Sequence, residues 1–186
     1  MPRSRYVALL RGINVGGKNI IGMKDLKATM EAHGLDNVST YIQSGNVLFE
    51  TDRPATSLEG EIEGALEKAF KVPLVVVVRS HRQLKAVIDK APAGFGTDPD
   101  TYHSDAVFLK APLTAQQVMG IVALRDGVDQ AWPGNGVVYF ARLSAQRTKS
   151  KMSKIVSAPE YKQMTIRSWS TTVKLLALLD AQSPKR

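Results

Sequence analysis

The stretch that decides the fold of the first half of the chain is Val38-Ser39-Thr40-Tyr41-Ile42-Gln43-Ser44-Gly45-Asn46-Val47-Leu48-Phe49-Glu50. Two strand-like runs, 38–43 and 46–50, flank Ser44-Gly45, and a two-residue link that contains glycine is typical of a tight β-hairpin. We therefore expect two neighbouring antiparallel strands here, and the remaining elements can be assigned outward from them.

Before the hairpin, residues 6–10 form an apolar run that ends at a Gly-rich loop, which predicts a buried strand. Residues 23–33 carry Met23, Leu26 and Met30 at helical spacing, with Gly34 placed to end the helix. These two elements and the first strand of the hairpin give the order β-α-β.

After the hairpin, Thr56 and Glu59 match a capping box for a helix whose apolar face runs from Leu58 to Phe70. Residues 74–78 are the most strand-like run in the chain. The first half therefore reads β-α-β-β-α-β, the split βαβ or ferredoxin-like order. Because the strands at 6–10 and 74–78 are apolar on both faces, we expect both faces of the sheet to be covered.

The same element order is predicted again after a linking segment. A helix capped by Ser80 and Gln83 and a loop rich in Pro, Gly and Asp occupy 81–104. Strands are expected at 105–110, 128–132, 137–142 and 165–169, a helix capped by Thr114 and Gln117, a short basic helix at 150–157, and a terminal helix at 172–179. We thus predict an α+β protein of two tandem ferredoxin-like (alpha-beta plait) subdomains, 1–80 and 105–186, joined by 81–104, and we interpret the repeated order as an internal duplication.

The positive charge of this basic protein is concentrated near the C-terminus. Residues 1–141 hold 15 Lys or Arg and 15 Asp or Glu, whereas residues 142–186 hold ten basic and two acidic residues, which accounts for the net charge of +8. A local basic surface attracts anions, although solvated lysines would give the same composition.

Composition excludes several classes of protein. No apolar run approaches the length of a membrane span, and the N-terminus has no apolar secretory core, so we expect a cytoplasmic protein with no membrane partner. Cysteine is absent, which excludes disulfides, a thiol nucleophile and cysteine-bound zinc. The three histidines show no metal-ligand spacing and no catalytic constellation stands out, so we predict no metal and no cofactor, assign no catalytic residue, and leave open whether the protein is an enzyme.

The segment richest in candidate ligand-binding residues follows the first strand. Gly12, Gly17 and Lys18 match G-x-x-x-x-G-K, but Asn19 stands where a P-loop needs Ser or Thr for magnesium. The more general expectation is an anion-binding nest of backbone N–H groups; its candidate residues are Arg11, Asn14, Gly16, Gly17, Lys18 and Asn19. A tight loop with two solvated cations is the alternative.

Topology brings a second set of polar residues to the same place. In a split βαβ unit the first two strands run in the same direction, so the turn after the second strand lies beside the loop after the first. This adds Gln43, Ser44 and Asn46 to the candidate site.

A third set lies near the C-terminus, where basic and hydroxyl residues alternate from Arg147 to Lys154. A helix that begins here could bind phosphate through its free N–H groups. Arg167 and Trp169 follow on the next predicted strand. The candidate residues of this set are Lys149, Ser150, Ser153, Lys154, Arg167 and Trp169, and a solvated basic helix is the alternative.

Residues 6–19 and 41–47, with Lys149–Lys154 and Thr165–Trp169, resemble the bacterial domain-of-unknown-function family numbered 1697. Arg167-Ser168-Trp169 departs from the Arg-Asn-Trp expected at the last of these motifs. The resemblance implies a duplicated ferredoxin-like fold and supplies no activity.

Three functions follow as hypotheses. The leading one is the binding of a phosphorylated ligand, a nucleotide or nucleic acid, with Arg11, Lys18 and the 43–46 turn as one wall and 147–154 with Arg167 as another. The second is an enzyme that acts on a small phosphorylated or acyl substrate, with the amides stabilising developing charge. The third is a protein-protein interaction module whose polar loops are structural; its sign would be loop side chains bonded to their own backbone beside an exposed apolar patch.

Overall fold

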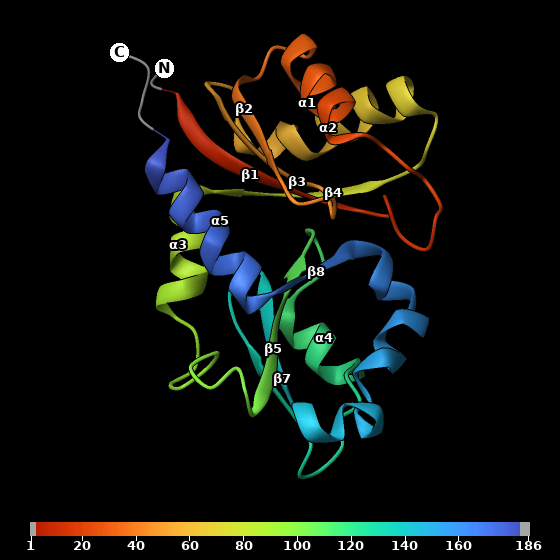
Figure 1. Ribbon diagram of the computed structural model, residues 1–186, viewed down its shortest axis with the longest axis vertical. Coiled ribbons are helices and arrows are strands. Elements are labelled where there is room, and N and C mark those ends of the chain that lie inside the picture. Colours follow the sequence, from red (N-terminus) through yellow and green to blue (C-terminus); the bar gives the residue numbers. More distant parts are fainter. Residues whose placement is uncertain (1–2, 183–186) are drawn as a thin grey trace. The chain divides into compact units, whose positions relative to one another are not determined.

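The computed structural model describes residues 3–182 and divides the chain into two compact units (Figure 1). Unit 1 comprises Met1–Lys85 and Leu175–Arg186, and unit 2 comprises Ala86–Lys174. The basic residues Lys185 and Arg186, part of the predicted C-terminal charge, lie outside the described residues. Each unit contains one four-stranded antiparallel sheet with helices, so the protein is a mixed α+β protein.

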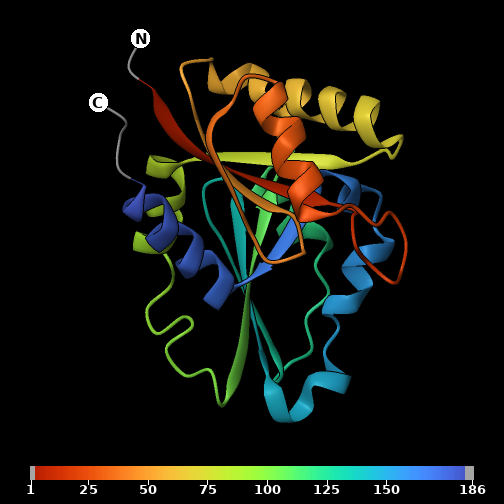
Figure 2. The same ribbon diagram turned by 45° about the horizontal axis from the view of Figure 1, so that its top comes forward.

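Unit 1 alternates strands and helices in the order that the sequence predicts. Its elements are β1 (Ser4–Arg11), α1 (Met23–Ala32), β2 (Asp36–Tyr41), β3 (Asn46–Thr51), α2 (Ala55–Phe70) and β4 (Val75–Ser80), followed by the start of α3 (His81–Asp89). The strands lie in the order β2-β3-β1-β4, and each neighbouring pair is antiparallel. Helices α1 and α2 cover one face of the sheet (Figure 2).

Strand β1 is buried on both faces, as the sequence predicts. Tyr6, Ala8 and Leu10 belong to the core beneath α1 and α2, while Val7 and Leu9 point to the opposite face and are also fully buried. On that opposite face Arg5 donates a hydrogen bond of 2.6 Å to the carbonyl oxygen of Leu179.

The last two turns of the C-terminal helix α5 (Trp169–Ala181) belong to unit 1. His81 contacts the carboxylate of Asp180 at 2.5 Å, and Gln182 donates to the carbonyl oxygen of Asn37. The sequence predicts that residues 175–186 belong to the second half. The described part of this range, 175–182, lies in unit 1 instead, because Leu175 and Leu179 are buried and these polar contacts are made within unit 1.

Unit 2 repeats the strand order of unit 1. Its remaining elements are β5 (Tyr102–Leu109), α4 (Ala115–Ile121), β6 (Asp129–Pro133), β7 (Val137–Leu143), the 3₁₀ helices η1 (Ser144–Lys149), η2 (Met152–Ser157) and η3 (Pro159–Gln163), and β8 (Met164–Ser168). The strands lie in the order β6-β7-β5-β8, again antiparallel throughout. Helix α4 and η2 pack on one face of this sheet through Val118, Met152 and Ile155.

A short helix is present within the range predicted at 150–157, but it is the 3₁₀ helix η2 (Met152–Ser157), the middle one of three short 3₁₀ helices in residues 144–163. Serine and threonine recur through this stretch and compete with helical hydrogen bonds. Met152 and Ile155 are its buried anchors, and a spacing of three residues aligns them on a 3₁₀ helix, which has three residues per turn.

The capping box predicted from Thr56 and Glu59 is not formed, and the carboxylate of Glu59 has another role. Helix α2 begins at Ala55 after Pro54, with no side-chain cap, so Thr56 lies inside the helix. Glu59 instead accepts a hydrogen bond of 2.9 Å from the backbone N–H of Val78, on the outer edge of β4. By contrast, the caps predicted from Ser80 with Gln83 and from Thr114 with Gln117 are confirmed.

Candidate functional site

The Gly-rich loop after β1 is a small hairpin. The backbone N–H of Asn14 donates to the carbonyl oxygen of Asn19 at 3.1 Å, and that of Lys18 donates to Val15 at 3.0 Å. Gly16 and Gly17 both have positive φ, 58° and 72°, which is the backbone geometry of a type I′ turn and favours glycine. The glycines are therefore explained by the turn itself.

Asn14 ties this hairpin to its surroundings. Its Nδ2 donates to the carbonyl oxygens of Ile21 at 3.0 Å and Gln43 at 2.9 Å, while its Oδ1 accepts from the N–H of Ile21 at 2.8 Å. Asn19 donates in the same way to the carbonyl oxygen of Gly12. The contact with Gln43 places the loop beside the β2–β3 turn, as the split βαβ order predicts.

The β2–β3 turn is closed by its own polar groups. Asn46 is fully buried, and its Nδ2 donates to the carbonyl oxygen of Tyr41 at 2.9 Å and to Oγ of Ser44 at 3.0 Å. Gly45 has φ +86°, and a Cβ there would lie 2.8 Å from the side chains of Leu10 and Ile13. The amides of Asn14, Asn19 and Asn46 thus hold the backbone of the loop and the turn, whereas the side chains of Lys18, Gln43 and Ser44 are exposed.

Three aliphatic side chains stand in the solvent at this edge of unit 1, and sequence reasoning missed them. Val15 is 70% exposed, Ile20 is 77% exposed and Ile42 is 48% exposed. We call these three residues the aliphatic edge. Two come from the Gly-rich hairpin and one from the adjoining turn, and the hydrogen bond from Asn14 Nδ2 to the carbonyl oxygen of Gln43 joins that hairpin to that turn. For Val15 and Ile20 the signal available in the sequence was their position in a polar loop, whereas Ile42 fell within the strand predicted at 38–43.

Ile42 adopts a left-handed backbone conformation, with φ +52°. A β-branched residue in this region is an outlier that costs about 1–3 kcal/mol. We therefore expect Ile42→Asn to raise the free energy of unfolding by about 0.5–1 kcal/mol, because asparagine tolerates this conformation and half of the isoleucine side chain is exposed. Urea unfolding followed by circular dichroism measures the difference; Ile42→Val, which keeps the branched Cβ, should show no gain.

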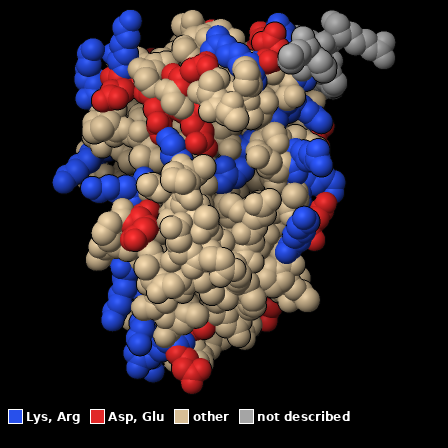
Figure 3. Space-filling model, turned by 180° about the vertical axis from the view of Figure 1, so that it is seen from behind, with Lys and Arg blue, Asp and Glu red and all other residues tan. Residues whose placement is uncertain are grey.

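In unit 2 the candidate residues Lys149, Ser150, Ser153 and Lys154 lie on the stretch of 3₁₀ helices, residues 144–163, which we call the basic segment. It carries five basic residues and one acidic residue, Glu160. The side chains of Arg147, Lys149, Lys154 and Lys162 are exposed. Figure 3 shows Lys and Arg side chains gathered at the edge of unit 2 along which this segment runs in Figure 1.

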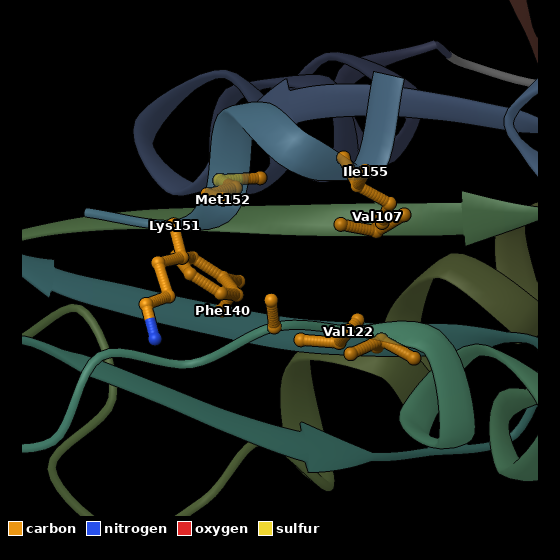
Figure 4. Close-up of a pocket in the computed structure, with 8 residues that line it drawn as sticks. Val107, Val122, Phe140, Lys151, Met152 and Ile155 are labelled. Atoms are coloured by element: carbon orange, nitrogen blue, oxygen red, sulfur yellow. The ribbon is translucent and has the colours of Figure 1, made fainter. Parts of the chain in front are cut away.

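The basic segment is fixed to the sheet of unit 2 by apolar and polar contacts. Met152 and Ile155 pack over Val107 and Phe140, around a small apolar pocket whose rim includes Lys151 (Figure 4). Next to it, Oδ2 of Asp129 on β6 accepts hydrogen bonds from the backbone N–H groups of Lys151 at 2.8 Å and Arg125 at 2.9 Å.

The pKa values of two buried carboxylates beneath the basic segment, Asp105 and Asp129, are shifted in opposite directions. Burial raises the pKa of Asp105, an effect only partly offset by His103, at 3.2 Å from its Oδ1, and by Arg142, at 3.8 Å from its Oδ2. Burial acts the same way on Asp129, but hydrogen bonds from Ser150 and from the N–H groups of Lys151 and Arg125 outweigh it and hold the pKa of Asp129 below its usual value. Asp129 is therefore an ionised anchor for the segment.

Arg167 and Trp169 do not lie with the exposed lysines. Arg167 is buried on the face of the sheet opposite Met152 and Ile155, where it donates to Oγ1 of Thr165 at 2.8 Å, and burial lowers its pKa to about 10. Trp169 begins α5 and packs edge-on against Phe95 at 4.9 Å between ring centroids. The sheet thus separates these two residues from Lys149, Ser150, Ser153 and Lys154.

Among residues 3–182, no group of three or more His, Asp or Glu side chains is placed to hold a metal ion. Within the same range, no helix has the length and apolar character to cross a membrane.

The fold of this chain is similar to that of a solved structure, the conserved bacterial protein SP0830 from Streptococcus pneumoniae. The two share 26% sequence identity with a TM-score of 0.81, and the similarity covers 95% of this chain and 99% of the other. Residues 3–139 match the family described as protein of unknown function (DUF1697), so the chain belongs to that family. A search of curated protein sequences finds no match.

Proposed function

We propose that the protein binds the phosphate backbone of nucleic acid through the basic segment of unit 2. The observation that carries this proposal is the exposed side chains of Arg147, Lys149, Lys154 and Lys162 on a segment with a single acid. Phosphate contacts from lysine and arginine supply most of the affinity of sequence-independent binding to nucleic acid.

The form of the segment favours a polymer over a single nucleotide. Its cations are distributed along the chain from Arg147 to Lys162, and the pocket beside them is apolar, with room for about one water-sized molecule. An extended polyanion can contact several of these cations at once. The segment is also held to the sheet by Met152, Ile155 and Asp129, so little order has to be gained on binding.

Two finer structural statements belong to this proposal. We infer that each unit is a ferredoxin-like plait and that the two arose by internal duplication, which the shared strand order, β2-β3-β1-β4 and β6-β7-β5-β8, supports. We also infer a cytoplasmic location, where nucleic acid is present, and the absence of cysteine agrees with a reducing compartment.

The test is a salt titration of binding to labelled duplex DNA and to a single-stranded oligonucleotide. We expect the logarithm of affinity to fall linearly with the logarithm of salt between about 50 and 200 mM. Lys149→Ala with Lys154→Ala should weaken binding about tenfold and reduce the slope for the duplex by about 1.8, since each lost phosphate contact accounts for about 0.9.

The matched control is Lys68→Ala with Lys71→Ala, which removes the same charge from exposed positions at the end of α2 in unit 1. Absence of binding by the wild type at low salt would refute the proposal. An equal loss in both double variants would show that net charge, rather than the basic segment, determines affinity.

A further inference from the structure

The aliphatic edge of unit 1 has no role in the function proposed above. Val15, Ile20 and Ile42 are the large hydrophobic side chains of unit 1 that stand exposed among its described residues. Exposed aliphatic residues scattered singly need no explanation, but these three lie on one hairpin and the turn hydrogen-bonded to it. Figures 1 and 2 both show the loop between β1 and α1 extending past the end of the sheet.

The backbone beneath these side chains is held by a set of hydrogen bonds. The Gly16-Gly17 turn is closed by two backbone hydrogen bonds, and Asn14 makes three more through its side chain. Ile42 is kept in a left-handed conformation that asparagine or glycine would adopt at lower cost. A strained residue whose side chain points into solvent favours a role for the side chain itself.

The residues that form the aliphatic edge carry charge of one sign, although the carboxylate of Asp25, in the first turn of α1, lies beside Gly22. Residues 11–22 and 41–46, which form this edge, contain Arg11 and Lys18 and no Asp or Glu. The side chains of Lys18 and Gln43 are exposed beside the aliphatic groups. This surface therefore complements a partner that is anionic and that can accept an aliphatic wedge.

Duplex DNA fits these requirements. Proteins that bind the minor groove contact it through Lys, Arg, Asn or Gln and insert apolar side chains, isoleucine among them, between base steps. Insertion of this kind unstacks a base step, which demands a wedge that does not yield. Rigidity is not needed for adsorption to a lipid surface, so the hydrogen-bonded support of the aliphatic edge favours DNA.

We propose that the aliphatic edge of unit 1, Val15 with Ile20 and Ile42 beside Lys18, inserts into the minor groove of duplex DNA and bends it. The proposal rests on the proposed function, because it assigns the duplex as the nucleic acid and adds a second contact surface. The two surfaces lie in different units, so each can be altered while the other is left intact.

The experiment uses the full chain and a duplex of about 30 base pairs with a donor fluorophore at one end and an acceptor at the other. Fluorescence anisotropy measures the fraction of duplex that is bound as protein is added, and energy transfer measures bending once the duplex is saturated. Both measurements are made at low salt. The wild type should shorten the end-to-end distance by an amount that corresponds to a bend of about 20° or more. The variant Val15→Ser with Ile20→Ser should bind within about threefold of the wild-type affinity and leave the duplex straight.

The matched control is Val173→Ser, which removes an exposed aliphatic side chain from α5 and should bend the duplex as the wild type does. A larger fall in affinity for Val15→Ser with Ile20→Ser, with the control unchanged, also supports the contact.

Other outcomes overturn the wedge. Binding without bending by the wild type, or equal bending by the double variant, refutes the wedge and leaves the proposed function standing. No duplex binding at low salt refutes the wedge, and binding of neither the duplex nor the single-stranded oligonucleotide refutes both proposals. In a separate measurement with phosphatidylglycerol vesicles, binding lost in the double variant while DNA bending is unchanged would assign the aliphatic edge to a lipid surface instead.

Discussion

Replacement of Gly96 by alanine is expected to lower the free energy of unfolding of unit 2 by about 3 kcal/mol. Overpacking a filled core costs about 1–3 kcal/mol, and a left-handed conformation costs a non-glycine residue about 1–2 kcal/mol more. Both apply at Gly96, which has φ +72° and whose added Cβ would lie 2.0 Å from Cδ1 of Trp169 and 2.4 Å from its Nε1.

The indole of Trp169 has little freedom to move away. It packs edge-on against Phe95 at 4.9 Å and against Tyr139 at 6.2 Å between ring centroids. Tyr139 is itself fixed, because its hydroxyl donates a hydrogen bond of 2.6 Å to the carbonyl oxygen of Val87. A shift of Trp169 would therefore disturb the whole aromatic cluster, which is why relaxation cannot absorb the clash.

Gly94→Ala separates the two causes. Gly94 lies in the same loop with φ +77°, and the nearest atom to an added Cβ is Oγ1 of Thr97 at 3.9 Å. This variant should lose only the backbone contribution, about 1 kcal/mol. Urea unfolding followed by circular dichroism compares the two, and Gly96→Ala should cost no more than Gly94→Ala once Trp169 is also replaced by alanine. Equal losses in the two single variants would contradict the clash.

The element order of this protein is readable from sequence because its signals are local. The apolar run at β1, the glycine after α1 and the hairpin at 38–50 each constrain a few residues, and every strand predicted from such runs is present. The two-residue Ser44-Gly45 link is wrong, however, because β2 ends at Tyr41, which pairs with Asn46, and the turn spans residues 42–45. The basic segment could not be read in this way. Its alternating Lys and Ser favour an exposed helix, and only the contacts of Met152 and Ile155 with the sheet reveal a 3₁₀ repeat.

The candidate site was predictable in part for the same reason. The split order placed the Gly-rich loop beside the β2–β3 turn, and the hydrogen bond from Asn14 to Gln43 confirms this. The partners of each amide are not encoded locally, so the sequence left open whether Asn14, Asn19 and Asn46 bond to backbone. They do so beside exposed aliphatic side chains, which is the sign stated above for an interaction module. Arg167 was grouped with the basic segment because it follows it in the chain, but strand alternation places it on the other face of the sheet.

Asp129→Ala is expected to lower the free energy of unfolding by about 3 kcal/mol and to loosen the basic segment. The substitution removes the carboxylate that accepts hydrogen bonds from the N–H groups of Lys151 and Arg125. Hydrogen bonds to a charged group contribute about 1.5–3 kcal/mol each, and buried donors left without an acceptor add to the loss. Because the segment would then be less ordered, affinity for duplex DNA should fall about threefold to tenfold.

The matched control is Asp126→Ala, which removes an exposed acid from the same loop and should change stability by less than about 0.5 kcal/mol. Urea unfolding gives the stability difference, and amide hydrogen exchange at Lys151 reports on the anchor directly. Fast exchange at Lys151 in Asp129→Ala, with unchanged exchange in β5, is the expected pattern. Affinity for DNA that stays equal to the wild type despite this exchange would show that anchoring of the basic segment does not matter for binding.

The same carboxylate predicts how stability depends on pH. The folded-state pKa of Asp129 lies below its usual value of 3.8, so its ionised form stabilises the folded protein above that value. This stabilisation is lost as pH falls through the folded-state pKa, because the protonated carboxyl is a poorer acceptor for the two N–H groups. The stability difference between the wild type and Asp129→Asn should therefore be constant from pH 7 down to about 5 and shrink toward about pH 3. A difference that grows over the lower interval would mean that burial, and not the hydrogen bonds of Lys151, Arg125 and Ser150, dominates the titration of Asp129.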